Sequence, residues 1–313
     1  MIGRVMRLGI LVAVFATVGL SVAKAPAPMA RQGLLSLENA RLFYEVTGSG
    51  EPIVIVHGGP GLDHNYLQPG MDVLADRNTL VYYDQRGTGR SDAPLDTSAV
   101  NLDAFVSDID ALRQALGYEQ ITLLTHSFGT LFGIEYARRY PENLRGLILM
   151  APVEPGQRFA DQAATRQASA RTEEDAADLA ELTSSEAFQA RDAATLSEVY
   201  RVAFKGAFRD RARIDDLQIE LSAKTAQNGQ DVGALLGQSL GTIDWWDRLG
   251  AIRTPTLVVH GRQDIAPISM ARALSEAFPN GSLALLDSGH FPYIEDPGGL
   301  TSAISSFFVD IAR

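Results

Sequence analysis

The chain has 313 residues, of which 46% are hydrophobic and 21% charged, a composition typical of a folded protein with one large core and not of a disordered or fibrous one. The sequence contains no cysteine, which excludes disulfides, thiol nucleophiles and cysteine-bound metals. Its formal net charge of −11 disfavours binding to nucleic acid or to anionic lipid surfaces.

Residues 1–30 have the pattern of a secretory signal peptide followed by a short linker. Arg4 and Arg7 precede an uncharged run over residues 8–23, and small residues and prolines follow it. The run is shorter than the roughly 20 apolar residues that a membrane-spanning helix needs, which disfavours the alternative of an uncleaved anchor. We therefore expect a periplasmic or secreted protein with no stable membrane insertion after the leader is removed.

Short runs of strand-forming residues alternate with helical patterns after the leader. This alternation is typical of a mostly parallel sheet with crossover helices, and the continuously apolar runs suit strands that are covered on both faces. One crossover helix is predicted between Asn101 and Gly117, where apolar residues recur at helical spacing. The predicted fold class is α/β with an eight-stranded sheet. The predicted strands are residues 34–37, 41–46, 52–57, 79–84, 121–125, 146–150, 256–260 and 282–286.

The composition of the sequence changes between the sixth and seventh predicted strands. Residues 153–241 are rich in alanine and in charged side chains, have high helix propensity and contain no convincing buried strand. We interpret this segment as an inserted helical cap. Residues 31–152 and 242–313 are then the two parts of one α/β core.

A strand, a sharp turn and a helical pattern follow one another around Ser127. In a nucleophile elbow of this kind the serine hydroxyl is exposed above the sheet, and the neighbouring amides lie at the positive end of a helix. The alternative is a serine that only caps a crossover helix. Thr125 occupies the position of the first glycine in the usual G-x-S-x-G elbow. We expect its β-branched side chain to crowd the turn.

A serine hydroxyl needs an adjacent base, itself oriented by a carboxylate, before it acts as a nucleophile. His290 is the candidate base, because the other four histidines end strands, adjoin the serine or lie in an earlier loop. Asp264 is the candidate acid, since it follows the preceding strand at the same edge of the sheet. The chain order Ser127, Asp264, His290 is that of the α/β-hydrolase triad. Asp287 and Asp296 are alternative acids.

The run His57-Gly58-Gly59-Pro60-Gly61 follows the third predicted strand. Its glycines allow backbone amides to approach a substrate closely. The N–H groups of Gly59 and Phe128 are the candidate donors to an oxyanion. A tight turn selected only for its backbone angles is the alternative.

Five motifs together resemble the proline iminopeptidase (prolyl aminopeptidase) branch of the α/β hydrolases. They are HGGPG at 57–61, DQRGTGRS at 84–91, HSFG at 126–129, GRQD at 261–264 and Gly289-His290. The resemblance covers about residues 40–150 and 245–313. It implies a serine aminopeptidase that needs no cofactor or metal and releases an N-terminal residue, often proline, from a short peptide.

Relatives with these loops also cleave esters, lactones and amides, so an esterase or lactonase is the first alternative. A non-catalytic binding protein on a hydrolase scaffold is the second, because Thr125 departs from the family pattern. Phe128 also stands where the peptidases often have tryptophan. The sequence leaves the natural substrate and the oligomeric state open.

An aminopeptidase must neutralise the ammonium group of its substrate, which acids of the cap could do. Arg86 and Arg90 are expected to form ion pairs within the scaffold and not to contact substrate. Trp245 and Trp246 are expected in the core or in a pocket wall. The candidate cap acids, each also compatible with a solvated helix face, are Glu173, Glu174, Glu181, Glu186, Glu198 and Glu220.

Overall fold

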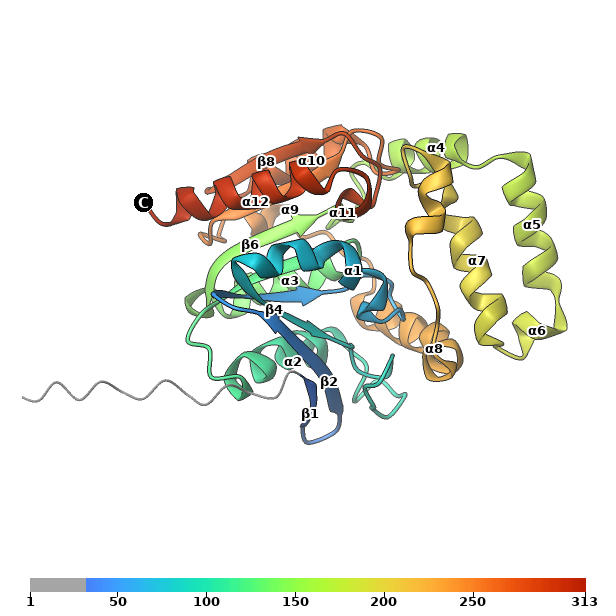
Figure 1. Ribbon diagram of the computed structural model, residues 1–313, viewed down its shortest axis with the longest axis horizontal. Coiled ribbons are helices and arrows are strands. Elements are labelled where there is room, and N and C mark those ends of the chain that lie inside the picture. Colours follow the sequence, from blue (N-terminus) through green and yellow to red (C-terminus); the bar gives the residue numbers. More distant parts are fainter. Residues whose placement is uncertain (1–31) are drawn as a thin grey trace, which may run out of the picture.

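The computed structural model describes residues 32–313, which form one eight-stranded sheet flanked by helices (Figure 1). The strand order is β1-β2-β4-β3-β5-β6-β7-β8, with antiparallel pairing of β1 with β2 and of β2 with β4 and parallel pairing elsewhere. The strands are β1 Gln32–Ser36, β2 Arg41–Gly48, β3 Glu51–Val56, β4 Asn78–Tyr83, β5 Ile121–His126, β6 Leu144–Met150, β7 Thr256–Gly261 and β8 Gly281–Leu286.

Every predicted strand overlaps an observed one, with ends that differ by at most two residues, so the α/β fold with a mostly parallel eight-stranded sheet is confirmed. The predicted crossover helix is α2, Leu102–Ala115. Its N-terminus is capped by the Asn101 side chain, which accepts a hydrogen bond from the Ala104 N–H at 2.9 Å. Gly117 ends the segment with a φ of 73°, a conformation that favours glycine. The predicted signal peptide lies outside the described residues and stays a prediction.

The central strands are buried on both faces because helices pack against each side of the sheet. Alternate residues of β3 show this arrangement. Val54 and Val56 belong to a cluster with side chains of α2 and of α3 (Gly129–Arg139), whereas Ile53 and Ile55 belong to a second cluster with side chains of α12 (Pro297–Ile311). The helices of the core are α1 Gln68–Met71, α2, α3 Gly129–Arg139, α9 Trp246–Leu249, α10 Ile268–Ala277, α11 Pro292–Glu295 and α12 Pro297–Ile311.

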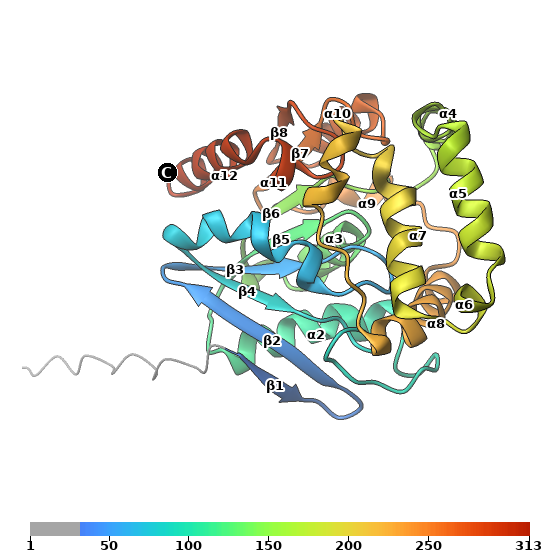
Figure 2. The ribbon, with the colours of Figure 1, turned by 45° about the vertical axis from the view of Figure 1, so that its right-hand side comes forward.

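Residues 153–241 contain helices and no strand, as expected for a helical insertion. In Figures 1 and 2 these helices lie together beyond one end of the sheet, on the right-hand side. Gly229 of this segment packs tightly on Gly61 of the HGGPG loop, since a Cβ on Gly229 would lie 2.5 Å from the Gly61 carbonyl oxygen. The helices are α4 Ala160–Ala170, α5 Glu173–Ser184, α6 Glu186–Gln189, α7 Ala193–Lys205 and α8 Ala223–Leu240.

The arginines of the DQRGTGRS segment contact groups of the scaffold, in line with the sequence prediction. Arg86 is buried and forms a two-pronged ion pair with Asp108, with N–O distances of 2.5 and 2.8 Å. The guanidinium of Arg90 lies 3.9 Å from carboxylate oxygens of Asp84 and Glu45, and it also lies over the Phe43 ring, 3.4 Å from the ring centre. Trp245 and Trp246 are buried in the core. Among residues 32–313, no helix is both long enough and apolar enough to cross a bilayer.

Candidate active site

Ser127 lies in a sharp turn between β5 and α3, as the elbow pattern predicts. Its φ of 52° is in the left-handed region, which costs a non-glycine residue about 1–3 kcal/mol and persists only where the surroundings enforce it. The Ser127 N–H donates to the Met150 carbonyl at 3.1 Å, and the Thr130 hydroxyl donates to the Ser127 carbonyl at 2.7 Å. A Cβ on Gly58 would lie 2.9 Å from the Ser127 Cβ, so only a glycine at position 58 leaves room for the turn.

The crowding expected from Thr125 is relieved by a glycine on the neighbouring helix. Thr125 is fully buried, and its hydroxyl donates to the Ile148 carbonyl of β6 at 3.2 Å. Its methyl group faces Gly133 of α3, where a Cβ would lie only 2.7 Å from the Thr125 Cγ2. Because position 133 has no side chain, the strand can carry a threonine while Ser127 keeps the elbow conformation.

The structure brings the three residues of the predicted triad together. The His290 Nε2 lies 3.0 Å from the Ser127 Oγ, and the His290 Nδ1 lies 3.1 and 3.2 Å from the two carboxylate oxygens of Asp264. Neither alternative acid has this position, because Asp287 pairs with Arg209 and Asp296 caps α12. The three groups form one continuous chain of hydrogen-bonding atoms from the hydroxyl to a buried carboxylate.

The carboxylate of Asp264 is fully buried but remains ionised over the physiological range. Burial alone would raise its pKa, yet the imidazoles of His290 and His260 and the N–H of Ala266 outweigh burial and lower the pKa to about 2. The Ala266 N–H donates to the carboxylate at 3.0 Å. Asp264 can therefore hold the His290 ring in one orientation, with its Nε2 free to face the serine.

The predicted oxyanion donors are free to bind a ligand atom. The neighbouring Gly58 N–H is occupied, since it donates to the Tyr66 hydroxyl at 2.7 Å. Within residues 32–313, neither the Gly59 N–H nor the Phe128 N–H donates to another protein atom. Phe128 is also the N-cap residue of α3, at the positive end of the helix dipole.

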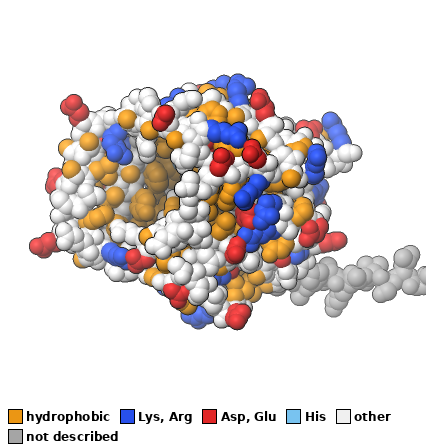
Figure 3. All heavy atoms as spheres, turned by 180° about the vertical axis from the view of Figure 1, so that it is seen from behind, with side chains coloured by type: hydrophobic (Ala, Val, Ile, Leu, Met, Phe, Trp, Pro, Cys, Tyr) orange, Lys and Arg blue, Asp and Glu red, His pale blue; other side chains and the backbone are white. Residues whose placement is uncertain are grey.

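Ser127 and His290 open into a cavity of about 250 Å³ with mainly apolar walls. Figure 3 shows a hollow with hydrophobic side chains on the side of the molecule where the helical insertion lies. The walls come from the loop after β6, from α4 and α7, and from the segment before and at the start of α10. The remaining lining residues are Pro152, Val153, Glu154, Phe159, Ala163, Gln167, Phe204, Ile265, Ala266, Pro267 and Met270.

Glu154 is the one acidic residue among those that line this cavity, and it is not among the acids predicted from the sequence. Its carboxylate accepts hydrogen bonds from the Phe159 N–H at 2.9 Å, from the Trp246 Nε1–H at 3.1 Å and from the Arg158 N–H. None of the six cap glutamates lines the cavity. The available signal was position, because Glu154 follows β6 at the edge of the sheet that carries Ser127.

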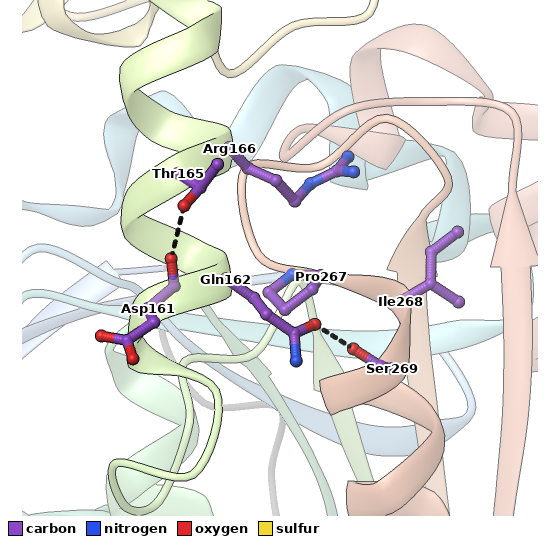
Figure 4. Close-up of a pocket in the computed structure, with 7 residues that line it drawn as sticks. All are labelled: Asp161, Gln162, Thr165, Arg166, Pro267, Ile268 and Ser269. Atoms are coloured by element: carbon purple, nitrogen blue, oxygen red, sulfur yellow. Dashed lines mark hydrogen bonds between the residues drawn. The ribbon is translucent and has the colours of Figure 1, made fainter.

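A second hollow of about 530 Å³ lies on an adjacent face of α4, against the start of α10 (Figure 4). Here Gln162 accepts a hydrogen bond from the Ser269 hydroxyl at 2.8 Å. Arg166 donates twice to the backbone carbonyl of Asp264, at 2.6 and 2.9 Å. The helical insertion is thus joined directly to the loop that carries the buried acid.

The remaining histidines are buried and hold the surrounding loops. His57 donates from Nδ1 to the Gly58 carbonyl at 2.8 Å and accepts at Nε2 from the Gln85 N–H at 3.1 Å. Burial lowers the pKa of His57 to about 4, so this ring is neutral near pH 7. His64 pairs with Asp84 at 2.6 Å. In the described part of the chain, no group of three or more histidine and acidic side chains has the arrangement of a metal site.

Comparison with known proteins gives the family. A family model described as the alpha/beta hydrolase fold matches residues 51–297. The chain belongs to the α/β-hydrolase family. This hydrolase is 28% identical over 298 residues to a protein named proline iminopeptidase from Heyndrickxia coagulans, which covers 90% of this chain and 100% of that protein.

Two solved structures show the same fold. A thermophilic esterase from Thermogutta terrifontis is 25% identical to the hydrolase, with a TM-score of 0.67 over 91% of this chain and 100% of that one. A proline iminopeptidase from Mycobacterium smegmatis is 23% identical, with a TM-score of 0.67 over 90% and 98% of the two chains. The hydrolase therefore shares its fold with both peptidases and esterases, and its substrate class does not follow from the fold.

The packing of Thr125 on Gly133 predicts a strong dependence on size at position 133. Gly133→Ala should lower the free energy of unfolding by about 1–3 kcal/mol, because the new methyl group overlaps Thr125. Urea unfolding measures the change. Gly237→Ala in α8, where a Cβ meets no atom within 4 Å, is the matched control and should be neutral or stabilising. In a Thr125→Gly background the Gly133→Ala change should lose most of its cost, because only the contact with Leu147 Cδ1 at 3.2 Å remains. An undiminished cost there would contradict the assigned overlap.

The burial of neutral His57 predicts an acid-dependent loss of stability. Because its pKa falls from an ordinary value of 6.5 to about 4, the unfolded chain binds a proton at a higher pH than the folded chain does. The free energy of unfolding should therefore decrease as the pH falls from 6.5 to 4. Urea titrations across this range should show a shallower decrease for His57→Gln, by about one proton. Equal slopes would show that His57 does not contribute.

Proposed function

We propose that this hydrolase is a serine hydrolase that acts through an acyl-enzyme. The observation that carries the proposal is the contact of the Ser127 hydroxyl with His290, which Asp264 orients in turn. His290 accepts the serine proton while the Oγ attacks a carbonyl carbon, and the N–H groups of Gly59 and Phe128 stabilise the resulting oxyanion. The protonated imidazole then donates to the leaving group. Water, activated by the same imidazole, releases the acyl group and restores the serine.

The substrate that we propose is a short peptide with a free amino terminus, from which the enzyme releases a small apolar residue such as proline. Similarity to proteins named proline iminopeptidase over most of the chain supports this class. The lone carboxylate of Glu154 in an apolar cavity also supports it, because three N–H donors occupy only part of its hydrogen-bonding capacity. A substrate ammonium could donate to the remaining lone pairs.

Hydrolysis of small carboxylic esters is the second candidate. The cavity beside Ser127 is mainly apolar, and the cap glutamates do not line it. The similarity to an esterase of known structure points the same way. An ester substrate would use the same nucleophile and oxyanion donors but would need no anchor for an amine.

A fluorophosphonate probe tests the nucleophile independently of the substrate class. The wild-type protein should be labelled at Ser127, as identified by mass spectrometry of its peptides. Ser127→Ala should not be labelled and should lose at least about 10³-fold in kcat, because the step that forms the acyl-enzyme is removed. A folded wild-type protein that is not labelled would contradict the serine mechanism and favour a binding protein.

The role of Glu154 separates the two substrate classes. If the hydrolase is an aminopeptidase, Glu154→Gln should lower kcat/KM for proline arylamide about tenfold more than kcat/KM for a short acyl ester. The reason is that the variant loses a charge-assisted hydrogen bond to the substrate ammonium. Glu181→Gln, on the exposed face of α5, removes the same charge away from the cavity and serves as the control. Equal effects on both substrates, or cleavage of N-acetylprolyl arylamide as fast as the free amine, would favour the esterase.

A further inference from the structure

A chain of buried hydrogen bonds joins the HGGPG loop to the loop of His290. The Gly58 N–H donates to the Tyr66 hydroxyl at 2.7 Å, and this hydroxyl lies 2.8 Å from the Nδ1 of His126. The Nε2 of His126 lies 3.0 Å from the backbone carbonyl oxygen of His290. Tyr66 and His126 are 5% and 1% exposed, so water does not compete for these bonds.

The two ends of this chain determine the direction of every bond in it. The Gly58 N–H can only donate, so the Tyr66 oxygen accepts there and its own proton goes to the Nδ1 of His126. The His290 carbonyl can only accept, so the proton of His126 is on Nε2. Burial, together with the nearby imidazole of His290, lowers the pKa of His126 to about 3 and keeps the ring neutral, as this pattern requires. The chain therefore has one consistent arrangement of protons.

The peptide between Gly58 and Gly59 needs such external support. Glycine has more backbone freedom than any other residue, and Gly59 has a φ of 130°. The Gly58 carbonyl and the Gly59 N–H belong to one planar peptide unit, so the bond from His57 to that carbonyl also fixes the direction of the N–H. The Tyr66 hydroxyl holds the preceding peptide unit, because it accepts a hydrogen bond from the Gly58 N–H. The oxyanion donor is thus fixed by side chains on both sides of Gly58.

We propose that Tyr66 and His126 are positioning residues, which set the Gly59 N–H at the correct distance from the imidazole of His290. Neither side chain forms a hydrogen bond to the Ser127 hydroxyl or to the ring nitrogens of His290, although the rings of His126 and His290 pack with their centres 5.0 Å apart. They act by joining two loops, one with an oxyanion donor and one with the general base, that no strand pairing holds together at this point. This role rests on the proposed serine mechanism, and it explains how the oxyanion donor and the general base are aligned with each other.

Two aromatic rings that follow His290 in the chain pack against the ring of His126. Phe291 and Tyr293 lie with their ring centres 5.8 and 5.9 Å from that of His126. Tyr293 is itself buried, and its hydroxyl donates to the backbone carbonyl of Tyr66 at 3.1 Å. Tyr293 therefore shares the residue type and burial of Tyr66 and also contacts the Tyr66 backbone, but its hydroxyl bonds neither to Gly58 nor to His126, so its variant controls for the loss of a buried hydroxyl outside the chain.

The test compares Tyr66→Phe with Tyr293→Phe, since each removes one buried hydroxyl and keeps the ring. Complete removal of an oxyanion donor costs about 10²–10³ in kcat, so a displaced donor should cost about tenfold. We expect Tyr66→Phe to lower the rate of fluorophosphonate labelling and the kcat for p-nitrophenyl acetate about tenfold, with KM within about twofold of wild type. Tyr293→Phe should stay within about twofold of wild type in both.

His126→Asn interrupts the chain of hydrogen bonds at a second position. Its side-chain oxygen can take the place of Nδ1 as an acceptor for Tyr66, while the bond to His290 is lost; labelling should again slow about tenfold. Thermal unfolding confirms that each variant is folded. Wild-type labelling rates in folded Tyr66→Phe or His126→Asn, or an equal loss in Tyr293→Phe, would overturn the positioning role and leave the serine mechanism intact. If the wild-type protein is not labelled at all, both proposals fail.

Discussion

The left-handed backbone of Ser127 is the constraint on which the rest of the site depends. A non-glycine residue adopts this conformation only where its neighbours leave no other, and here those neighbours lack side chains. Gly58 faces the Ser127 Cβ, and a Cβ on Gly129 would lie 2.5 Å from the His57 carbonyl oxygen. Gly133 makes room one turn further along α3. The strain is therefore maintained by close backbone packing, and the hydroxyl is turned toward His290.

Burial of polar groups limits the site to few arrangements of hydrogen bonds and protons. Asp264 is an ionised carboxylate without contact with solvent, whereas His57 and His126 are neutral rings with one proton each and two hydrogen bonds. In a low-dielectric interior such groups have few acceptable arrangements, because an unsatisfied polar atom costs more than a misplaced apolar one. A single arrangement of protons therefore extends from the HGGPG loop to the loop of His290.

The sequence allowed the strands and the relative positions of Ser127, Asp264 and His290 to be predicted, because parallel strands place their carboxyl ends at one edge of a sheet. It did not reveal how Thr125 is tolerated, since the compensating Gly133 has no motif of its own. Tyr66 and His126 are 60 positions apart, and only the folded loops bring them into contact. Helix propensity predicts the secondary structure of a segment but not the direction in which each side chain points, so it does not tell whether any of the six cap glutamates faces the cavity. Glu154, at the edge of the sheet, lines the cavity instead.

The two hydrogen bonds from Arg166 to the Asp264 carbonyl have a consequence for how this enzyme could diversify. Exchange of helical insertions between relatives is one route to new substrates, since the insertion interrupts the core at a single point. In this chain a graft that lacks an arginine at the same place would leave the backbone of the triad acid without two donors. The insertion and the core therefore depend on each other at this contact. A helical insertion taken from a relative would need a basic side chain at the position of Arg166.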